Sequence, residues 1–346
     1  MKIALDAMGG DFAPEQIVAG GVRAHRELGV DVIFVGQKDK VDAALAKAGA
    51  GKWAQIEDAP EVIAMDEHPA QAVRSKKASS IVRGVQMVED GRAAGFVSAG
   101  NSGAVMAAGL FGLRRIPGVD RPAIGAVIPT ATGRCLLLDA GANADARPEY
   151  LAQFARMGTI YAERLMDIAT PRVALLSNGQ EPGKGNQLVQ ATEPLLRAAP
   201  GINFVGNIEG NDIFRGKADV IVCDGFTGNV LVKTAEGAAE LLFRSIRDAI
   251  KGDPIASVGG LLIRPKLQAL RARVDWREFG GWLLLGVNGV TVIAHGRSDA
   301  RAIRSAIRVA RDAVDRQVIA TFATAFTDAA AAPRGASTPS AQPFVT

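Results

Sequence analysis

The chain has 346 residues, of which 48% are hydrophobic and 22% are charged, and its formal net charge is +4. This length and balance allow a large buried core and are typical of a globular protein with one large domain or two closely joined ones. Only 5% of the residues are aromatic, and the chain has neither zinc-finger spacing nor a basic region followed by heptads. These features argue against a nucleic-acid-binding protein.

The two cysteines, Cys135 and Cys223, lie at the ends of apolar runs, which predicts buried strand residues rather than a disulfide framework. No apolar stretch approaches the roughly 20 residues that a membrane-spanning helix needs. Asp6 comes too early for a signal peptide. We therefore expect a cytoplasmic protein, whose basic excess fits an anionic small ligand, an acidic protein partner or a membrane surface.

Short runs rich in Leu, Ile and Val alternate with longer amphipathic stretches along the chain. The short runs predict strands over 2–6, 31–35, 95–98, 123–128, 135–139, 172–176, 202–205, 219–223, 282–285 and 290–294. The amphipathic stretches predict helices over 14–28, 38–48, 79–90, 102–113, 147–167, 186–198, 227–251, 265–274 and 299–326. Near-continuous apolar strands that alternate with helices indicate an α/β fold, with a mainly parallel sheet and helices on both faces.

Two segments depart from this rhythm. Residues 329–346 are rich in Ala, Pro, Ser and Thr, and they predict a disordered tail after a single α/β unit of one or two lobes over 1–328. Residues 251–277 are basic and amphipathic, which predicts either a surface or subunit-packing helix, or a docking site for an acidic carrier protein or an anionic membrane. The basic residues of this docking site are Arg264, Lys266, Arg271 and Arg273.

A glycine turn follows the first predicted strand, and a helix comes next. In open α/β sheets, ligands bind beyond the carboxyl ends of the strands, so we predict a substrate loop here. Its residues are Asp6, Gly9, Gly10 and Asp11. Asp11 could equally cap the following helix. The Gly-x-Gly-x-x-Gly pattern of dinucleotide sites is absent from this turn.

The best candidate for a phosphate site is the loop 98–103, which leads into an apolar helix. Backbone N–H groups at Gly100 and Gly103 can face an anion, and the positive end of the helix dipole favours negative charge. The further donors of this loop are the side chains of Ser98, Asn101 and Ser102. A tight turn capped by Ser102 is the alternative.

Arg74 and Lys76 precede another predicted helix, which Ser79 or Ser80 can cap. These cations form either a solvated surface or a contact with phosphate or phosphopantetheine.

Several later loops also carry polar residues just after predicted strands. Lys184 lies between two glycines in a loop that resembles a P-loop but is one residue too short, and it predicts a phosphate or oxyanion contact. Asn207 and Asn229 can donate to a developing oxyanion. Glu209 and Asp224 are candidates for a base or for an orienting group.

His295 ends a predicted strand, and it is a candidate for either a catalytic or a structural residue. The chain shows no Cys/His metal cluster, no Gly-x-Ser-x-Gly elbow and no nucleophile paired with a histidine. The loops offer many hydrogen-bond donors to an anion but no histidine-activated nucleophile for a covalent intermediate. This combination favours direct transfer, in which phosphate itself is the nucleophile. We therefore expect neither a metal nor a cofactor.

Together and in this order, the motifs resemble the PlsX family of bacterial phosphate acyltransferases, from Met1 to about Phe326. The motifs that carry the resemblance are Asp6-Ala7-Met8-Gly9-Gly10-Asp11, Ser98-Ala99-Gly100-Asn101-Ser102-Gly103-Ala104, Gly206-Asn207-Ile208-Glu209-Gly210, Cys223-Asp224-Gly225-Phe226-Thr227-Gly228-Asn229 and Leu285-Gly286-Val287-Asn288-Gly289. The resemblance implies a fold like the isocitrate and isopropylmalate dehydrogenases and the phosphotransacetylases, a homodimer, and peripheral association with the inner face of the cell membrane. It also implies that acyl-(acyl carrier protein) reacts with inorganic phosphate to give acyl phosphate for phospholipid synthesis.

The resulting hypothesis places phosphate on the loop 98–103, assisted by Lys184 and by Arg74 or Lys76, beneath the carbonyl group of a thioester. Asn207, Asn229 or backbone N–H groups then hold the oxyanion. Two alternatives remain: a phosphotransacetylase-like enzyme that uses acyl-CoA, and a membrane-associated scaffold that binds phosphate or lipid. A dehydrogenase of the related fold is a third, and it lacks a dinucleotide fingerprint.

Overall fold

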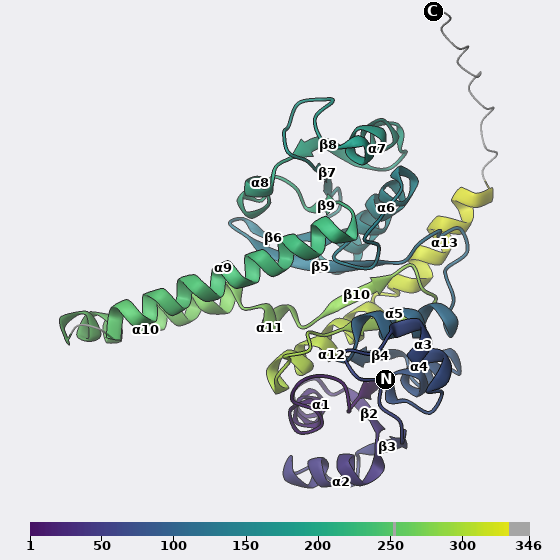
Figure 1. Ribbon diagram of the computed structural model, residues 1–346, viewed down its shortest axis with the longest axis vertical. Helices are drawn as coiled ribbons and strands as arrows, with labels where there is room; N and C mark the ends of the chain where they lie inside the picture. The colour runs from purple at the N-terminus through teal and green to yellow at the C-terminus, as the bar shows by residue number, and fades with distance from the viewer. Residues whose placement is uncertain (252–253, 332–346) are drawn as a thin grey trace, which may run out of the picture.

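The computed structural model describes residues 1–251 and 254–331, and the strands among them form one 11-stranded sheet (Figure 1). These strands are β1 (Lys2–Asp6), β2 (Asp31–Gly36), β3 (Gln55–Asp58), β4 (Gly95–Ser98), β5 (Ala123–Thr130), β6 (Gly133–Leu138), β7 (Arg172–Leu176), β8 (Asn203–Ile208), β9 (Val220–Val222), β10 (Trp282–Leu285) and β11 (Val290–Ile293). Every predicted strand is present, and β3 is an addition. Its sequence, Gln-Ile-Glu-Asp, lies at the edge of the sheet and therefore lacks the apolar signal of a buried strand.

The strand order is β3-β2-β1-β4-β11-β10-β5-β6-β9-β7-β8. Only the pairs β11–β10, β10–β5 and β5–β6 are antiparallel, so the sheet is mainly parallel, as predicted. These three pairs reverse the strand direction between the two ends of the sheet. The carboxyl ends of β1, β4 and β11 therefore point one way along the strand direction. The carboxyl ends of β6, β7, β8 and β9 point the opposite way.

Helices cover both faces of this sheet, which confirms the predicted α/β class. They are α1 (Glu15–Leu28), α2 (Lys38–Lys47), α3 (Pro69–Ser75), α4 (Ser80–Glu89), α5 (Ser102–Phe111), α6 (Pro148–Leu165), α7 (Gln187–Ala198), α8 (Gly210–Arg215), α9 (Gly225–Lys251), α10 (Pro254–Val274), α11 (Trp276–Phe279), α12 (Ala300–Asp315) and α13 (Val318–Ala331). Sequence reasoning misses α3, α8 and α11, because so few residues hold too little of a 3.6-residue repeat.

Two hydrophobic cores lie on the two faces of the sheet. Ile3 and Leu5 of β1 enter one core together with α1, α6, α12 and α13. Ala4 enters the other core with α4 and α5. Successive side chains of a strand point to opposite faces, so each buried strand is held from both sides and its carboxyl end is fixed in place.

Two helix predictions differ from the structure. The predicted helix 299–326 is two helices, α12 and α13, because Gln317 between them has a φ angle of 52°. The predicted helix 265–274 is only the second half of α10, which begins at Pro254, because Gly260 in its first half packs directly against Ile250 of α9.

The first residues of the predicted tail are helical instead. Helix α13 continues to Ala331, so residues 329–331 are helical. Residues 332–346 lie outside the described residues.

Helices α9 and α10 lie side by side and project away from the sheet as a long hairpin (Figure 1). Several large apolar side chains on this hairpin are exposed, namely Leu241, Leu242, Val258, Leu261, Leu262 and Ile263. Within residues 1–251 and 254–331, none of the helices combines the length and the apolar character needed to cross a membrane.

Candidate active site

Two groups of loops hold most of the predicted site residues, and they follow strands that run in opposite directions. We term the loops 6–11, 98–103 and 295–297, which follow β1, β4 and β11, the β1–β4 cluster. We term the loop 139–143, which follows β6, and residues 224–229, which follow β9 and include the first turn of α9, the β6–β9 cluster.

A buried carboxyl group lies at the centre of the β1–β4 cluster. Asp6 is fully buried, and its Oδ2 accepts a hydrogen bond from Ser98 Oγ at 2.6 Å, while its Oδ1 accepts one from the Met8 N–H at 3.1 Å. Ser98 Oγ in turn accepts from the Gly100 N–H at 3.0 Å. Burial raises the pKa of Asp6, and the hydroxyl and amide donors oppose that rise. Asp6 and Ser98 therefore tie two loops together, and their polar atoms point inward.

Glycines allow the loops of this cluster to touch. A Cβ atom at Gly9 would lie 2.6 Å from the nitrogen of Gly100. Gly10 has a φ angle of 105°, and a Cβ atom there would lie 2.9 Å from the carbonyl oxygen of Gly296. The Asp11 N–H donates to the same oxygen at 2.8 Å, and α1 has no side-chain cap, so Asp11 is not its cap. The predicted substrate loop therefore packs against both of its neighbouring loops.

Asn101 caps α5 and braces the segment before α3. Its Oδ1 accepts from the Ala104 N–H at 3.0 Å. Its Nδ2 lies 3.1–3.2 Å from three carbonyl oxygens, those of Ala64, Met65 and Glu67. Both ends of the Asn101 amide are thus occupied, and the predicted phosphate contact from this residue would require breaking these bonds.

The first turn of α5 presents donors that have no internal partner. The first N–H groups of a helix lack intrahelical acceptors, and Asn101 satisfies that of Ala104, so those of Ser102 and Gly103 remain. Ser102 is exposed, and within the described part of the chain its hydroxyl makes no hydrogen bond. Of the residues in the predicted phosphate loop, Ser102 and Gly103 are therefore the best placed to face an anion.

The predicted cations Arg74 and Lys76 lie away from this turn. Lys76 Nζ is 2.6 Å from Glu67 Oε1, in an ion pair that anchors the segment before α3. The guanidinium carbon of Arg74 lies 5.1 Å from the ring centroid of Phe111, at the far end of α5. Phe111 is nine residues after Ser102, which corresponds to about 13 Å along an α-helix. Arg74 is thus too distant to share an anion with the first turn of α5.

His295 is held between the β11 loop and α9. Its Nδ1 accepts from the Arg297 N–H at 3.3 Å, which assigns the ring proton to Nε2. That Nε2 lies 3.5 Å from Glu236 Oε2 of α9, and Arg297 pairs with the same carboxylate at 3.3 Å. These contacts orient the imidazole ring and attach the β1–β4 cluster to α9.

Sequence reasoning misses Asp139, the centre of the β6–β9 cluster, although the stretch 139–143 repeats the pattern of an acid and a glycine just after a strand. Asp139 Oδ2 accepts from the Asn143 N–H at 2.7 Å and from the Asn143 side-chain amide at 2.9 Å. Its Oδ1 accepts, at 3.0–3.1 Å, from the N–H groups of Ile124, Gly141 and Ala142. Burial raises the pKa of Asp139 and these donors oppose the rise. The carboxyl group thus organises the whole loop.

Asp224 and Asn229 join this loop to the start of α9. Asp224 accepts from the Thr227 N–H at 2.8 Å and from Thr227 Oγ1 at 2.7 Å, so it caps the helix. Asn229 Nδ2 donates to the carbonyl oxygen of Ala140 at 3.2 Å. A Cβ atom at Gly141 would lie 2.8 Å from that same Nδ2, so the two loops are in close contact.

The first turns of α9 connect the two clusters. Asn229 contacts the loop 139–143, and Glu236 contacts His295. Glu236 lies seven positions after Asn229, which corresponds to about 10 Å along an α-helix. The candidate active site is therefore the region beside the first three turns of α9, which both clusters reach.

Asn207 and Glu209 belong to neither cluster. Asn207 lies on β8 and is 6% exposed. The Asn207 side chain lies close enough to Glu193 on α7 to lower the pKa of that carboxyl, after the larger effect of Arg197, but among the described residues neither of its polar atoms makes a well-formed hydrogen bond. Glu209 forms a reciprocal capping box with Asp212 at the start of α8. The structure thus places these two residues against α7 and α8 and does not bring them to Asn229.

Lys184 and the basic residues of the predicted docking segment are exposed. Lys184 lies in the loop between β7 and α7, and its ammonium group has no acidic partner among the described residues. Arg264 and Lys266 are exposed on α10, whereas the side chains of Arg271 and Arg273 lie outside the described residues. In the ranges that the structure covers, no three His, Cys, Asp or Glu side chains gather into a metal site.

Comparisons with known proteins identify the family. A family model described as "Fatty acid synthesis protein" matches residues 1–321. The phosphate acyltransferase of Pelotomaculum thermopropionicum is 51% identical over 319 residues, which cover 92% of this chain and 93% of that protein. The phosphate acyltransferase of Heliobacterium modesticaldum is 52% identical over 322 residues, which cover 92% and 96% respectively.

Solved structures share the fold at much lower identity. A phosphotransacetylase from Streptococcus pyogenes has a TM-score of 0.60 and 21% identity, and the match covers 92% of this chain and 94% of that chain. A branched-chain phosphotransacylase from Enterococcus faecalis has a TM-score of 0.56 and 14% identity, with 91% and 99% covered. These likenesses confirm the expected phosphotransacetylase-like fold. The much higher identity to the two curated relatives, over nearly their whole length, shows that this chain belongs to the phosphate acyltransferase family and is an acyltransferase.

Proposed function

We propose that this protein transfers an acyl group from acyl carrier protein to inorganic phosphate, giving acyl phosphate for phospholipid synthesis. The observation that carries this proposal is the open first turn of α5. There the N–H groups of Ser102 and Gly103 and the Ser102 hydroxyl face outward at the positive end of the helix. A phosphate acyltransferase must hold a small anion beside an activated carbonyl group, and this turn offers donors of the required kind.

The proposed step is a direct attack. A phosphate oxygen forms a bond to the thioester carbonyl carbon, the carbon–sulfur bond breaks, and the carrier leaves as a thiolate that takes up a proton from water. Phosphate is already anionic at neutral pH, so this step needs no strong base. That requirement agrees with His295, whose ring nitrogens face Arg297 and Glu236, and with Asp224, whose carboxylate caps α9.

Two residues are proposed to stabilise charge during this step. Asn229 lies where the two clusters meet, and its amide has a second N–H besides the one that bonds Ala140. Such a donor can bind the oxyanion that develops on the carbonyl group. Lys184 supplies an exposed ammonium group that can approach an anionic substrate.

The test is mass-spectrometric detection of acyl phosphate after the protein is mixed with acyl carrier thioester and phosphate. Ser102→Ala should raise the KM for phosphate, and Asn229→Ala should lower kcat by about tenfold or more. Ser245→Ala is the matched control, because this hydroxyl is exposed on α9 beyond the first three turns. Wild-type kcat/KM for phosphate in both Ser102→Ala and Asn229→Ala would rule out the assignment.

The alternative is an acyl-CoA-dependent enzyme, which the phosphotransacetylase likeness favours. Parallel assays with acyl carrier thioester and acyl-CoA separate the two, since the proposed function predicts a higher kcat/KM for the carrier substrate.

We further propose that the α9–α10 hairpin rests on an anionic membrane surface. Leu262 is 76% exposed and Leu261 is 66% exposed, and the basic residues Arg264 and Lys266 follow them directly. Exposed apolar side chains next to cations that have no ion pair among the described residues are typical of interfacial helices, whereas a second copy packed on the same face would bring like charges together. Leu262→Glu should abolish co-sedimentation with anionic vesicles. Unchanged co-sedimentation, combined with a loss of dimers by light scattering, would instead assign this surface to the expected homodimer.

A further inference from the structure

Helix α3 packs along α5, and we term their shared exposed surface, from Ser102 to Phe111, the α3–α5 surface. Pro69 at the start of α3 packs against Gly103, where a Cβ atom would lie 2.5 Å from Pro69 Cγ. Arg74 near the end of α3 lies over Phe111, the last residue of α5. The two helices therefore run in the same direction, from the first turn of α5 toward Phe111.

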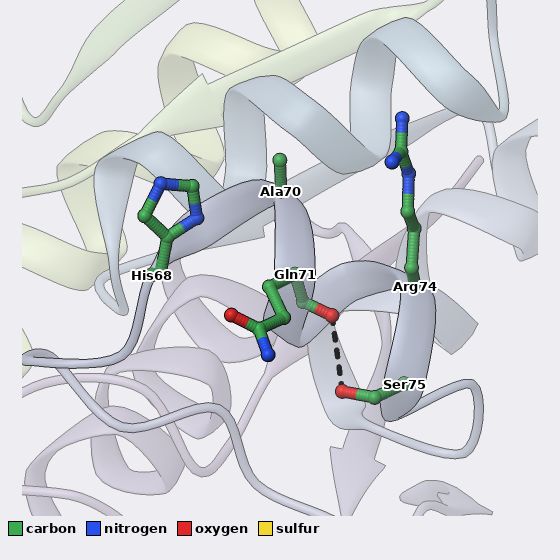
Figure 2. A pocket seen from close by; sticks show the side chains of 5 residues that line it. All are labelled: His68, Ala70, Gln71, Arg74 and Ser75. Atoms are coloured by element: carbon green, nitrogen blue, oxygen red, sulfur yellow. Dashed lines mark hydrogen bonds between the residues drawn. The ribbon is translucent and has the colours of Figure 1, made fainter.

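A cavity of about 430 Å³ opens on α3. Its lining residues are His68, Ala70, Gln71, Arg74 and Ser75. Figure 2 shows that His68, Ala70 and Arg74 project from the same side of α3, whereas Gln71 and Ser75 point to another side. The Ser75 hydroxyl turns back to the Gln71 carbonyl oxygen at 3.0 Å, which leaves Arg74 as the charged group of the cavity.

The far end of the α3–α5 surface, at Arg74 and Phe111, has residue types that are typical of an interface centre. Phe111 is 48% exposed, although a phenylalanine on a helix is ordinarily buried. The Arg74 guanidinium group stacks on its ring and keeps its N–H groups available, because Arg74 has no carboxylate partner among the described residues. Aromatic residues and arginine are the residue types that most often dominate binding energy at interfaces.

The charges around this end favour an acidic partner. Lys77 and Arg114, three residues beyond Arg74 and Phe111 respectively, are also exposed. Of the nearby acids, Glu67 is neutralised by its ion pair with Lys76, Glu61 accepts from the Ala78 N–H at 2.8 Å, and Glu89 lies beside Gly112. The exposed cations Arg74, Lys77 and Arg114 have no ion pair with an acid among the described residues.

We propose that the α3–α5 surface is the docking surface for the acyl carrier. An acidic helix of the carrier seats on Arg74 and Phe111, and its thioester-bearing arm lies along α3 toward Ser102. The rise of α5 from Ser102 to Phe111 is about 13 Å, so the carrier body stays beside Phe111 while the thioester reaches the open first turn. This inference rests on the proposed function and adds to it the surface that distinguishes a carrier protein from acyl-CoA.

The test compares kcat/KM for acyl carrier thioester with kcat/KM for acyl-CoA in the full chain. In Arg74→Glu and in Phe111→Ala, the ratio of the two should fall by at least about tenfold, with Arg74→Lys intermediate because lysine keeps the charge but stacks less well. Lys52→Glu is the matched charge reversal, since Lys52 is exposed and has no ion pair among the described residues. It should leave the ratio within about twofold of wild type.

Direct titration with carrier protein gives an independent reading, in which the Kd should rise by about tenfold in Phe111→Ala. A ratio and a Kd that both stay within about twofold of wild type in Arg74→Glu and Phe111→Ala overturn the docking surface alone. A wild-type protein that forms acyl phosphate from acyl-CoA but not from carrier thioester overturns the proposed carrier substrate, and the docking surface with it.

Discussion

Replacing Ser98 by alanine tests whether the β1–β4 cluster is held together from inside. The substitution removes the 2.6 Å hydrogen bond to Asp6 and leaves the Gly100 N–H, now 3.0 Å from Ser98 Oγ, without its acceptor. A hydrogen bond to a carboxyl group contributes about 1.5–3 kcal/mol, and an unpaired buried N–H costs about 1–3 kcal/mol. The expected loss is therefore roughly 3–5 kcal/mol, or a Tm lower by about 4–7 °C for a chain of this size.

Urea unfolding followed by circular dichroism measures this loss. Ser102→Ala is the control, because the exposed Ser102 hydroxyl has no partner among the described residues and its removal should cost less than about 0.5 kcal/mol. The two variants should separate stability from catalysis, with Ser98→Ala lowering the free energy of unfolding and Ser102→Ala raising the KM for phosphate. A loss of less than about 1 kcal/mol in Ser98→Ala would show that Asp6 does not hold the two loops through this hydroxyl.

Three further substitutions probe the same architecture. Burial raises the folded pKa of Asp6 above the ordinary pKa of an aspartate, so its favourable contribution is complete below that ordinary pKa and is lost as the pH rises through the folded pKa. The stability of wild type relative to Asp6→Asn should therefore fall with rising pH, and a difference that is flat with pH would contradict this reasoning. Gly103→Ala should push α3 away through the contact with Pro69 and raise the KM for phosphate, measured by initial rates, with an unchanged KM as the contrary result. Gly228→Ala would collide with the backbone of Asp139, and it should lower both Tm and kcat, so wild-type values of both would refute the close packing of these loops.

The local chemistry of the site was largely readable along the chain. Glycine, serine and asparagine just after apolar strands indicated the loops at 98–103 and 224–229, because such residues are needed only where backbone turns sharply or meets a ligand. Individual roles were less readable, because one polar side chain can serve a ligand or the chain itself. Asn101 and Asp224 looked available for substrate, yet they cap α5 and α9.

The sequence by itself determined the α/β class, the order of the strands along the chain and the polar character of the loops, because alternating apolar runs and amphipathic stretches are local patterns. Only the tertiary structure decided that β10 and β5 pair antiparallel with their neighbours, so that the two clusters follow strands that run in opposite directions. It also decided that α9 joins the two clusters through Asn229 and Glu236. Strand direction and helix placement depend on contacts between residues far apart in the chain, and no local window of sequence contains them.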